Sequence, residues 1–292
     1  MRHAILGAGG IGGLLAAALA RAGGDVSLLL RPDSLERYAS RLAVESVVLG
    51  DFEVEVTATA LLDRDVDALW VTTKATQLEA SLVLAPPDRV GDAVVIPLLN
   101  GVDHLALLRT RYRTVVAAAI RVESERLSPN RIRQRSPFIR MELAGAEPIA
   151  EEVRAAGIDC SLRLDELSLL WDKLAFLAPL ALATTALQAP LGGVREDKRY
   201  RGCQDEAVAV ARAEGADIDI EAMRALQASA PDEMQSSMQK DVVAGREPEL
   251  DAIAGPILRG GRRHGIPVPN TDALVRLVAS LSARGAPALR DP

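Results

Sequence analysis

The sequence predicts an α/β protein in two parts: an N-terminal Rossmann-type, doubly wound parallel sheet followed by an all-α C-terminal domain. Up to about residue 164, short apolar runs alternate with stretches of helical spacing, which is typical of a parallel sheet covered by helices. From Glu166 onward apolar residues recur at helical spacing and no strand pattern returns. We therefore expect two domains, residues 1–164 and residues 165–292.

The first elements surround a glycine-rich turn. The apolar run Ala4-Ile5-Leu6 precedes Gly7-Ala8-Gly9-Gly10-Ile11-Gly12, and a helix over 13–20 and a second apolar run over 26–30 follow. This strand, turn, helix and strand are the context that a dinucleotide-binding fingerprint requires. In such a fingerprint the first glycine permits the tight turn, the second lets a pyrophosphate approach the backbone, and the third lets the helix pack on the strand. The residues that we expect to bind cofactor phosphates at this helix N-terminus are Gly7, Ala8, Gly9, Gly10, Ile11 and Gly12.

A secretory signal peptide is the alternative interpretation of this N-terminal segment. Met1-Arg2-His3 is basic, and Ala18-Leu19-Ala20 resembles a cleavage site. However, the segment holds five glycines between Gly7 and Gly13, which makes a poor apolar signal helix. Its removal would also delete the first strand of the sheet, so we favour the nucleotide-binding interpretation.

The residue at the end of the second strand indicates which dinucleotide binds. An acidic residue there bonds the ribose hydroxyls of NAD, whereas an arginine suits the 2′-phosphate of NADP. Arg31 occupies this position, and Asp33 comes two residues later. A solvated arginine at a strand end is the alternative. The pattern favours NADP(H) as the cofactor and residues 1–164 as an NADP-binding domain.

Further elements follow in alternation. In the first domain we expect helices over 34–42, 77–84, 102–111 and 148–156, and strands over 53–58, 68–73, 93–99, 114–120 and 159–162. Residues 123–144 have mixed charge and indicate antiparallel edge strands. In the second domain we expect helices from 166 and over 200–214, 220–228, 236–244, 250–264 and 271–282.

Polar residues follow two of the expected strands. Lys74 comes after the strand over 68–73, and Asn100 comes after the strand over 93–99. Ligands of open parallel sheets collect outside the carboxyl ends of the strands. We expect Lys74 to contact cofactor phosphate or ribose, and Asn100 to contact the ribose or the substrate. The alternatives are a lysine in water and an Asn-Gly turn.

Composition narrows the class of partner and the compartment. The chain of 292 residues has a net charge of −6 and no basic run, which argues against nucleic acid. Cys160 and Cys203 are the only cysteines; they indicate neither a disulfide framework nor a zinc site and fit the cytoplasm. Residues 174–194 carry no charge, but they include Pro179 and Pro190 and are better interpreted as a buried helix than as a membrane span.

Several motifs along nearly the whole chain resemble those of the ketopantoate reductase family (2-dehydropantoate 2-reductases). They comprise the glycine turn, Thr73-Lys74, Asn100-Gly101, Trp171-Asp172-Lys173-Leu174, Ser236-Ser237-Met238-Gln239-Lys240-Asp241, Gly245-Arg246-Glu247-Pro248-Glu249-Leu250-Asp251 and His264-Gly265-Ile266-Pro267-Val268-Pro269. The resemblance implies an NADPH-dependent reductase of a small 2-oxo acid, in pantothenate biosynthesis. A Leu- and Ala-rich helical domain is compatible with a homodimer.

The same resemblance implies roles for three residues of the helical domain. The lysine after the tryptophan, Lys173, is the general acid that protonates the developing alkoxide, and Glu249 supports it. A nearby carboxylate keeps a buried ammonium charged against desolvation. Ser237 contacts the substrate carboxylate. Without the family, Lys173 would be a solvated helix lysine, and Ser236 or Ser237 would be a helix cap.

The chain departs from the family pattern near the lysine. Family members usually carry asparagines four and eight residues after it, where this chain has Leu177 and Ala181. Both positions share a helical face with Lys173. Apolar residues there favour a bulkier or more apolar 2-oxo acid, or another carbonyl compound, over ketopantoate. A non-catalytic NADP(H)-binding or redox-sensing protein is the alternative from another class.

Overall fold

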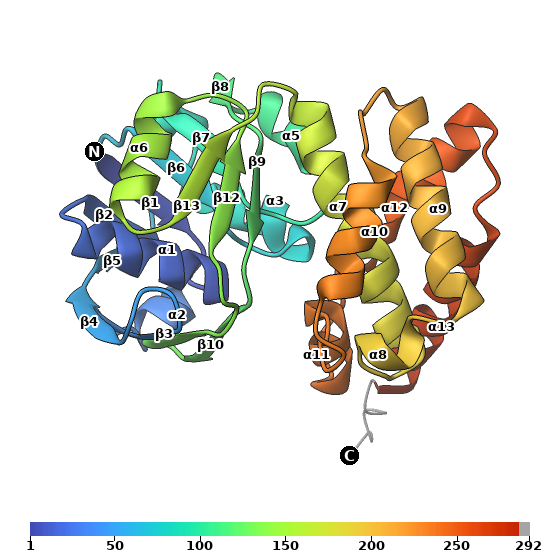
Figure 1. Ribbon diagram of the computed structural model, residues 1–292. Helices are drawn as coiled ribbons and strands as arrows, with labels where there is room; N and C mark the ends of the chain where they lie inside the picture. Colours follow the sequence, from blue (N-terminus) through green and yellow to red (C-terminus); the bar gives the residue numbers. More distant parts are fainter. Residues whose placement is uncertain (286–292) are drawn as a thin grey trace, which may run out of the picture. The chain divides into compact units, whose positions relative to one another are not determined.

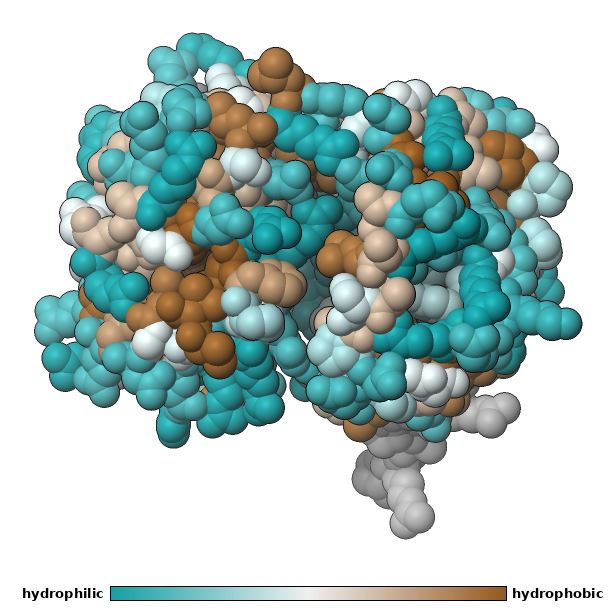
Figure 2. All heavy atoms as spheres, viewed as in Figure 1, coloured by the Kyte–Doolittle hydropathy of each residue, from teal (hydrophilic) through white to brown (hydrophobic). Residues whose placement is uncertain are grey.

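The computed structural model describes residues 1–285, and the chain divides into two compact units. The first unit comprises Met1–Leu99 and His104–Leu169, and the second comprises Asn100–Asp103 and the chain from Leu170 onward. A parallel sheet with helices is followed by helices alone, so the expected α/β fold class is confirmed (Figure 1). The surface seen in Figure 2 is mainly hydrophilic, with hydrophobic side chains gathered over the part of the first unit that holds α1 and β10.

The first unit is built on a six-stranded sheet in the order β5-β2-β1-β6-β7-β8, with every neighbouring pair parallel. The strands are β1 (Arg2–Leu6), β2 (Asp25–Leu29), β5 (Thr57–Thr59), β6 (Ala68–Val71), β7 (Val94–Pro97) and β8 (Thr114–Val115). The chain leaves β1 towards β2 on one side and continues with β6 on the other. This reversal of strand order is the topological switch point at which doubly wound sheets bind their ligands.

Short helices connect these strands. They are α1 (Gly10–Arg21), α2 (Pro32–Leu35), the 3₁₀ turns η1 (Ala75–Gln77) and η2 (Leu82–Leu84), α3 (Leu78–Ser81), α4 (Pro87–Val90), α5 (His104–Arg109) and α6 (Glu147–Ala155). Helix α1 is the most central of them, since its residues from Gly12 to Leu19 are all buried. Such burial requires the small and apolar side chains that fill this stretch of the sequence.

Two smaller sheets complete the first unit. One has the order β10-β11-β3-β4 and the other β13-β12-β9. Their strands are β3 (Arg41–Ser46), β4 (Phe52–Glu55), β9 (Ala118–Arg121), β10 (Ser124–Ser128), β11 (Arg131–Gln134), β12 (Arg140–Leu143) and β13 (Asp159–Leu162). Strands β10 and β11 form an antiparallel hairpin that joins β3 in parallel and packs against α1.

The structure corrects the helix that we expected over 34–42. Only Pro32–Leu35 is helical, and Arg41–Ser46 is strand β3. Leu42 and Val44 are buried while their neighbours are more exposed, which is the alternation of a strand. Strand β3 pairs with β4 on one side and with β11, about ninety residues further along the chain, on the other. Residues 34–42 contain neither partner, so their local pattern does not indicate the strand.

Two other expected strands each prove to be two. Residues 53–58 divide into β4 and β5, and residues 114–120 divide into β8 and β9. In both cases the chain leaves one sheet and joins another, because the two halves pair with different partners. Apolar residues alternate in the same way before and after the chain changes sheet, so the sequence does not indicate where the first strand ends and the second begins.

The second unit is helical throughout its described residues. It contains most of α7 (Glu166–Ala186), then α8 (Leu191–Val194), α9 (Lys198–Ala213), α10 (Ile220–Ser229), α11 (Ser237–Val243), α12 (Leu250–His264) and α13 (Pro269–Gly285). The short helix α8 was not expected. Helix α7 is the one described helix that is long and apolar enough to cross a membrane, but 72% of its apolar window is buried inside the protein, as a core helix requires.

His3, in the centre of β1, is a fully buried histidine. Its Nδ1 accepts a hydrogen bond of 3.2 Å from Trp70 Nε1, which can only donate. Its Nε2 lies 3.6 Å from the Glu152 carboxylate, which is too far for a hydrogen bond. Burial lowers the pKa of His3 below 6.5, and this outweighs the opposite effect of Glu152. The folded protein therefore holds His3 in its neutral form.

This buried histidine predicts a pH dependence of stability. As the pH falls through 6.5, the unfolded chain binds a proton at His3 that the folded chain does not, so the free energy of unfolding decreases. We expect His3→Gln to flatten this decrease between about pH 7 and pH 5, above the range in which carboxylates titrate. Urea unfolding at each pH measures it, with His264→Gln as the exposed control. Equal slopes for wild type and His3→Gln would contradict the assignment.

Candidate active site

The glycine turn between β1 and α1 has a different physical requirement at each position. Gly7 has a φ of 101°, which residues with a side chain rarely adopt. A Cβ at Gly12 would lie 1.9 Å from the carbonyl oxygen of Gly7, so only glycine permits this packing of α1 on the turn. A Cβ at Gly9, by contrast, would meet no protein atom within 4 Å.

The open side of Gly9 fits a phosphate group. Gly9 is the N-cap of α1, no side chain caps the helix there, and its φ of −75° suits any residue. Unpaired N–H groups and the positive end of the helix dipole therefore face a space that a side chain at Gly9 would reduce. This is the local arrangement that binds dinucleotide phosphates in doubly wound sheets.

Two further glycines of this stretch make room for the β10–β11 hairpin. A Cβ at Gly10 would lie 2.3 Å from the carbonyl oxygen of Ser124, and one at Gly13 would lie 2.5 Å from Cδ1 of Ile132. Ser124 Oγ also donates a hydrogen bond of 2.8 Å to the carbonyl oxygen of Gly10. The sequence assigned Gly10 to phosphate binding alone and did not indicate its contact with the hairpin.

A pocket of about 290 Å³ lies beside the glycine turn in the first unit. Its lining comes from the turn, the end of β2, the segment after α2 and the hairpin, and consists of Ala8, Leu30, Ser34, Arg37, Tyr38, Arg126, Leu127, Ser128 and Pro129. Arg31, the predicted determinant for NADP, is exposed at the N-cap of α2 and is not among the lining residues.

Arg37 and Arg126 are therefore arginines of this pocket that sequence reasoning missed. Arg37 lies in a stretch that was expected to be a surface helix, and Arg126 lies in the irregular region 123–144. Neither position belongs to a motif with fixed spacing. The nearest available signal was the alternating pattern of the hairpin, which does not report what the hairpin faces.

Lys74 follows β6 by three residues and precedes η1, so it stands at the carboxyl end of the strand next to β1. Its side chain is half-buried. Two residues before it, Thr72 Oγ1 donates to the carbonyl oxygens of Leu6 and Gly7, at 3.0 and 2.7 Å. These hydrogen bonds hold the end of β6 against the glycine turn. They therefore fix the backbone position of Lys74 at the switch point.

In the second unit, a small hollow brings together three residues that the sequence singled out, Asn100, Ser237 and Glu249. Its lining is completed by Leu177, Ala181, Met238, Asp241 and Ile253. Asn100 Nδ2 donates a hydrogen bond of 3.3 Å to Glu249 Oε2, between residues 149 positions apart in the chain. Three polar groups from separate segments thus converge on one recess.

The Asn-Gly dipeptide has a structural reason in this hollow. Gly101 has a φ of 86°, and a Cβ there would lie 2.5 Å from the carbonyl oxygen of Ala252 in the first turn of α12. The missing side chain lets the segment approach α12 closely, which places Asn100 against Glu249 at the start of the same helix. The Asn-Gly dipeptide therefore turns the chain as it predicts, and Asn100 also lines the hollow.

The two serines of the Ser-Ser-Met motif have different positions. Ser236 is buried and caps α11, since its Oγ accepts a hydrogen bond of 3.1 Å from the Gln239 N–H. It also shares a hydrogen bond of 2.9 Å with Thr184 Oγ1 of α7. Ser237 is exposed and lines the hollow. The cap is thus Ser236, and Ser237 is the serine of the motif that lines the hollow.

Lys173 lies on α7, is half-buried, and follows the buried Trp171 by two positions in the chain. It precedes Leu177 and Ala181 by one and two helical turns and shares their face of the helix. Both of those residues line the hollow, although Lys173 itself does not. The α7 face thus runs from the lysine into the apolar wall of the recess.

Asp241 is a lining residue to which the sequence assigned no role, although it ends the Ser-Ser-Met-x-x-Asp motif. It is buried, and its carboxylate accepts a hydrogen bond of 2.8 Å from Arg246 Nε. The apolar part of the wall consists of Leu177 together with Ala181, Met238 and Ile253, which are each exposed by 3% or less. Polar and apolar side chains therefore both line the hollow.

A glycine turn at the switch point of a parallel sheet, with a helix dipole aimed at open space, is the arrangement of nicotinamide-dinucleotide-dependent enzymes. The chain is an NADP-dependent oxidoreductase that acts on the CH–OH/C=O pair. Two family models match it: the ketopantoate reductase PanE/ApbA model over residues 3–143, and that family's C-terminal model over residues 166–282. The chain belongs to the ketopantoate reductase family.

Individual relatives agree with this assignment. A 2-dehydropantoate 2-reductase from Caulobacter vibrioides is 30% identical over 298 residues, covering 94% of this chain and 97% of the relative. A crystal structure of a PanE/ApbA family ketopantoate reductase from Ralstonia eutropha superimposes with a TM-score of 0.86 at 27% identity, covering 98% and 99%. D-mandelate dehydrogenase, in a complex with NADH and anilino(oxo)acetate, has a TM-score of 0.87 at 21% identity over 98% and 99%, which shows a shared fold alone.

The glycine turn yields a paired prediction for cofactor binding. We expect Gly9→Ala to weaken NADPH binding about tenfold or more, because the added methyl group occupies the open side of the turn. Its free energy of unfolding should change by at most about 1 kcal/mol. Gly12→Ala should instead destabilise the fold by about 1–3 kcal/mol, because it drives a methyl group into Gly7. Calorimetric titration and urea unfolding measure the two effects; NADPH affinity unchanged in Gly9→Ala would contradict the assignment.

Proposed function

We propose that the protein reduces a 2-oxo acid with NADPH, with Lys173 as general acid and Glu249 as its support. The observation that carries the proposal is the hydrogen bond from Asn100 Nδ2 to Glu249 Oε2, in a hollow that Ser237 also lines. A carboxylate, an amide and a hydroxyl meet there against an apolar wall. Polar groups of these kinds bind the reacting end of a small acid, and apolar side chains contact the rest of it.

NADPH, when bound, supplies a hydride to the carbonyl carbon of the substrate. The carbonyl oxygen then gains negative charge, which the ammonium group of Lys173 stabilises and neutralises by donating a proton to it. The lysine recovers its proton from water. Glu249 favours the charged form of the lysine, since a carboxylate opposes the desolvation that lowers the pKa of a buried amine. The product is a 2-hydroxy acid.

Asn100 and Ser237 are the groups proposed for binding and orientation. Asn100 holds Glu249 through one N–H of its amide, which leaves its carbonyl oxygen and second N–H for the substrate or the cofactor ribose. The Ser237 hydroxyl donates to the substrate carboxylate. On the cofactor side, the glycine turn from Gly7 to Gly12 and Lys74 are proposed to hold phosphate and ribose.

The substrate proposed is a 2-oxo acid whose side chain is more apolar than that of ketopantoate. Leu177 and Ala181 stand on the wall of the hollow where family members usually carry asparagines. A substrate hydroxyl facing these residues loses its hydrogen bonds to water and gains none in return. An apolar side chain instead gains from the burial of its surface. Reduction of 2-dehydropantoate, and thus pantothenate biosynthesis, is the second candidate, favoured by the names of the curated relatives.

The proposal includes a homodimer and a cytoplasmic location. Cys160 and Cys203 are buried, and neither forms a disulfide among the described residues, which suits a reducing compartment. Light scattering of the purified protein tests the dimer.

Replacement of the proposed general acid tests the mechanism. We expect Lys173→Ala to lower kcat by about 10²–10⁴ with 2-oxo acids, because no other group supplies the proton in the same place. Affinity for NADPH should not change. Lys198→Ala, an exposed lysine at the start of α9, is the matched control and should keep full activity. The measurement is NADPH oxidation with a panel of 2-oxo acids that runs from ketopantoate to branched and aromatic side chains.

Two results would contradict the proposal. One is a protein that binds NADPH tightly and oxidises it with no member of the panel, which is the behaviour of a non-catalytic relative. The other is a Lys173→Ala variant with the wild-type rate. Preference for ketopantoate within the panel would overturn the apolar substrate class and leave the lysine mechanism in place.

The adjacent serines give a further test of the site. We expect Ser237→Ala to raise KM for the 2-oxo acid about tenfold or more, because it removes a hydrogen bond to a charged group. Its thermal stability should not change, since Ser237 is exposed. Ser236→Ala should show the reverse: a loss of about 1 kcal/mol in the free energy of unfolding, because the helix cap is lost, and little change in KM. Equal KM values for Ser237→Ala and wild type would contradict the role of Ser237.

A further inference from the structure

The pocket beside the glycine turn has the composition of an anion site. Two of its lining residues, Arg37 and Arg126, are arginines, and no aspartate or glutamate lines it. Leu30, Tyr38 and Leu127 add apolar and aromatic surface, and Ser34 and Ser128 add hydroxyl groups. A volume of about 290 Å³ suits part of a nucleotide rather than a macromolecule.

Most arginines of the first unit are ion-paired, and the two in the pocket are exceptions. Pairs at or below 3.1 Å include Arg2 with Asp67, Arg64 with Asp25, Arg135 with Glu125 and Arg140 with Asp159. Among the described residues, the guanidinium of Arg126 has neither an ion-pair nor a hydrogen-bond partner. Arg37 uses only Nε, which donates 2.9 Å to the carbonyl oxygen of Asp33. Both arginines keep terminal N–H donors for a ligand.

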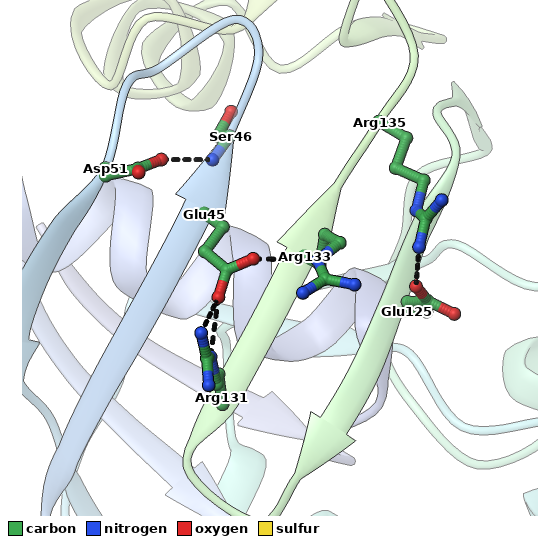
Figure 3. A network of polar contacts seen from close by, with 7 residues as sticks. All are labelled: Glu45, Ser46, Asp51, Glu125, Arg131, Arg133 and Arg135. Atoms are coloured by element: carbon green, nitrogen blue, oxygen red, sulfur yellow. Dashed lines mark hydrogen bonds and ion pairs between the residues drawn. The ribbon is translucent and has the colours of Figure 1, made fainter.

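The wall that carries Arg126 is held in place from two sides. Gly10 and Gly13 pack closely against the hairpin, and Ser124 Oγ donates a hydrogen bond to the carbonyl oxygen of Gly10 in the turn. On the other side, Figure 3 shows Glu45 of β3 between Arg131 and Arg133 of β11, with hydrogen bonds of 2.6 and 2.7 Å from their Nε atoms. These two arginines hold the pKa of Glu45 below its usual value. Arg126 therefore projects from a braced strand rather than from a loose loop.

The charge of Arg126 is also not neutralised by its neighbour in the chain. Glu125 is the adjacent carboxylate, but it binds Arg135 across the hairpin at 3.1 Å, as Figure 3 shows. The opposite wall is fixed as well, because Tyr38 Oη donates 2.9 Å to the carbonyl oxygen of Val56. Two positively charged side chains on separate, braced segments thus line one small pocket at the end of β2.

We propose that Arg37 and Arg126 together bind the adenosine 2′-phosphate of NADP(H) and set the preference for NADP(H) over NAD(H). A phosphate dianion is the ligand that two guanidinium groups bind best, through charge-assisted and bidentate hydrogen bonds. The segment after the second strand is where doubly wound enzymes distinguish the two cofactors. The assignment rests on the proposed use of NADPH. It adds an arginine after α2 and an arginine of the hairpin to Arg31, the arginine that the sequence predicts for this phosphate.

Binding without turnover tests the assignment. Calorimetric titrations of the full chain with NADP⁺, NAD⁺, 2′-AMP and 5′-AMP compare wild type with Arg37→Ala, Arg126→Ala and Arg31→Ala. We expect each pocket variant to lose about tenfold or more in affinity for NADP⁺ and 2′-AMP, and less than about twofold for NAD⁺ and 5′-AMP. Arg140→Ala, an arginine of the same unit that lies outside the pocket lining and is ion-paired with Asp159, is the matched control and should bind all four ligands like wild type.

Specific outcomes overturn the proposal. If Arg31→Ala alone abolishes the preference for NADP⁺ and the pocket variants retain it, Arg31 is the determinant. If Arg126→Ala weakens NADP⁺ and NAD⁺ equally, the hairpin has a structural role only. No carbonyl substrate is present in these titrations, so a protein that reduces no 2-oxo acid still gives a decisive answer about the two arginines.

Discussion

The first unit depends on one constraint, the close approach of backbone to backbone at the glycine turn. Helix α1 packs on β1 only because Gly12 brings no Cβ against the carbonyl oxygen of Gly7. The absence of a side chain at Gly9 leaves the helix N-terminus open to an anion. The absence of side chains at Gly10 and Gly13 makes room for the β10–β11 hairpin. Core packing, the open helix N-terminus and the position of the hairpin that carries Arg126 are thus consequences of a single glycine-rich stretch. This explains why the stretch holds two glycines more than the three that a dinucleotide fingerprint needs.

The second unit uses the same device once. Gly101 follows β7 with a positive φ and lies so close to Ala252 that no side chain fits between them. Asn100 thereby reaches Glu249, the first contact of a hollow whose other walls come from helices. In both units a glycine just beyond a strand end determines which polar groups can meet. The functional groups of the site belong to side chains, but the glycines determine how closely the segments that carry them can approach one another.

The periodicity of apolar residues was sufficient to predict helices and strands that bury one face against their neighbours. The helix expected over 250–264 has the bounds of α12, and the strand expected over 159–162 has those of β13. Periodicity failed for residues 34–42, because β3 forms by pairing with β4 and β11, which both lie outside that segment. Periodicity also did not indicate Arg37 and Arg126, because a pocket wall formed by distant segments produces no regular spacing of residues along the chain. The choice of cap between Ser236 and Ser237 required the hydrogen bond from the Gln239 N–H to Ser236 Oγ, which only the fold shows.

Substrate recognition is separable from the rest of the fold because of where α7 places its residues. Trp171, Leu174 and Ala178 are buried in the core, whereas Leu177 remains half-buried and lines the hollow. A change at a core position alters packing and costs stability. A change on the hollow-facing side alters the chemistry of the recess and leaves the helix supported by its other faces. Lys173 belongs to that same side, so the proposed proton donor and the wall proposed to select the substrate share one face of the helix. A family can therefore keep one reaction while its members diverge in the acid that they reduce.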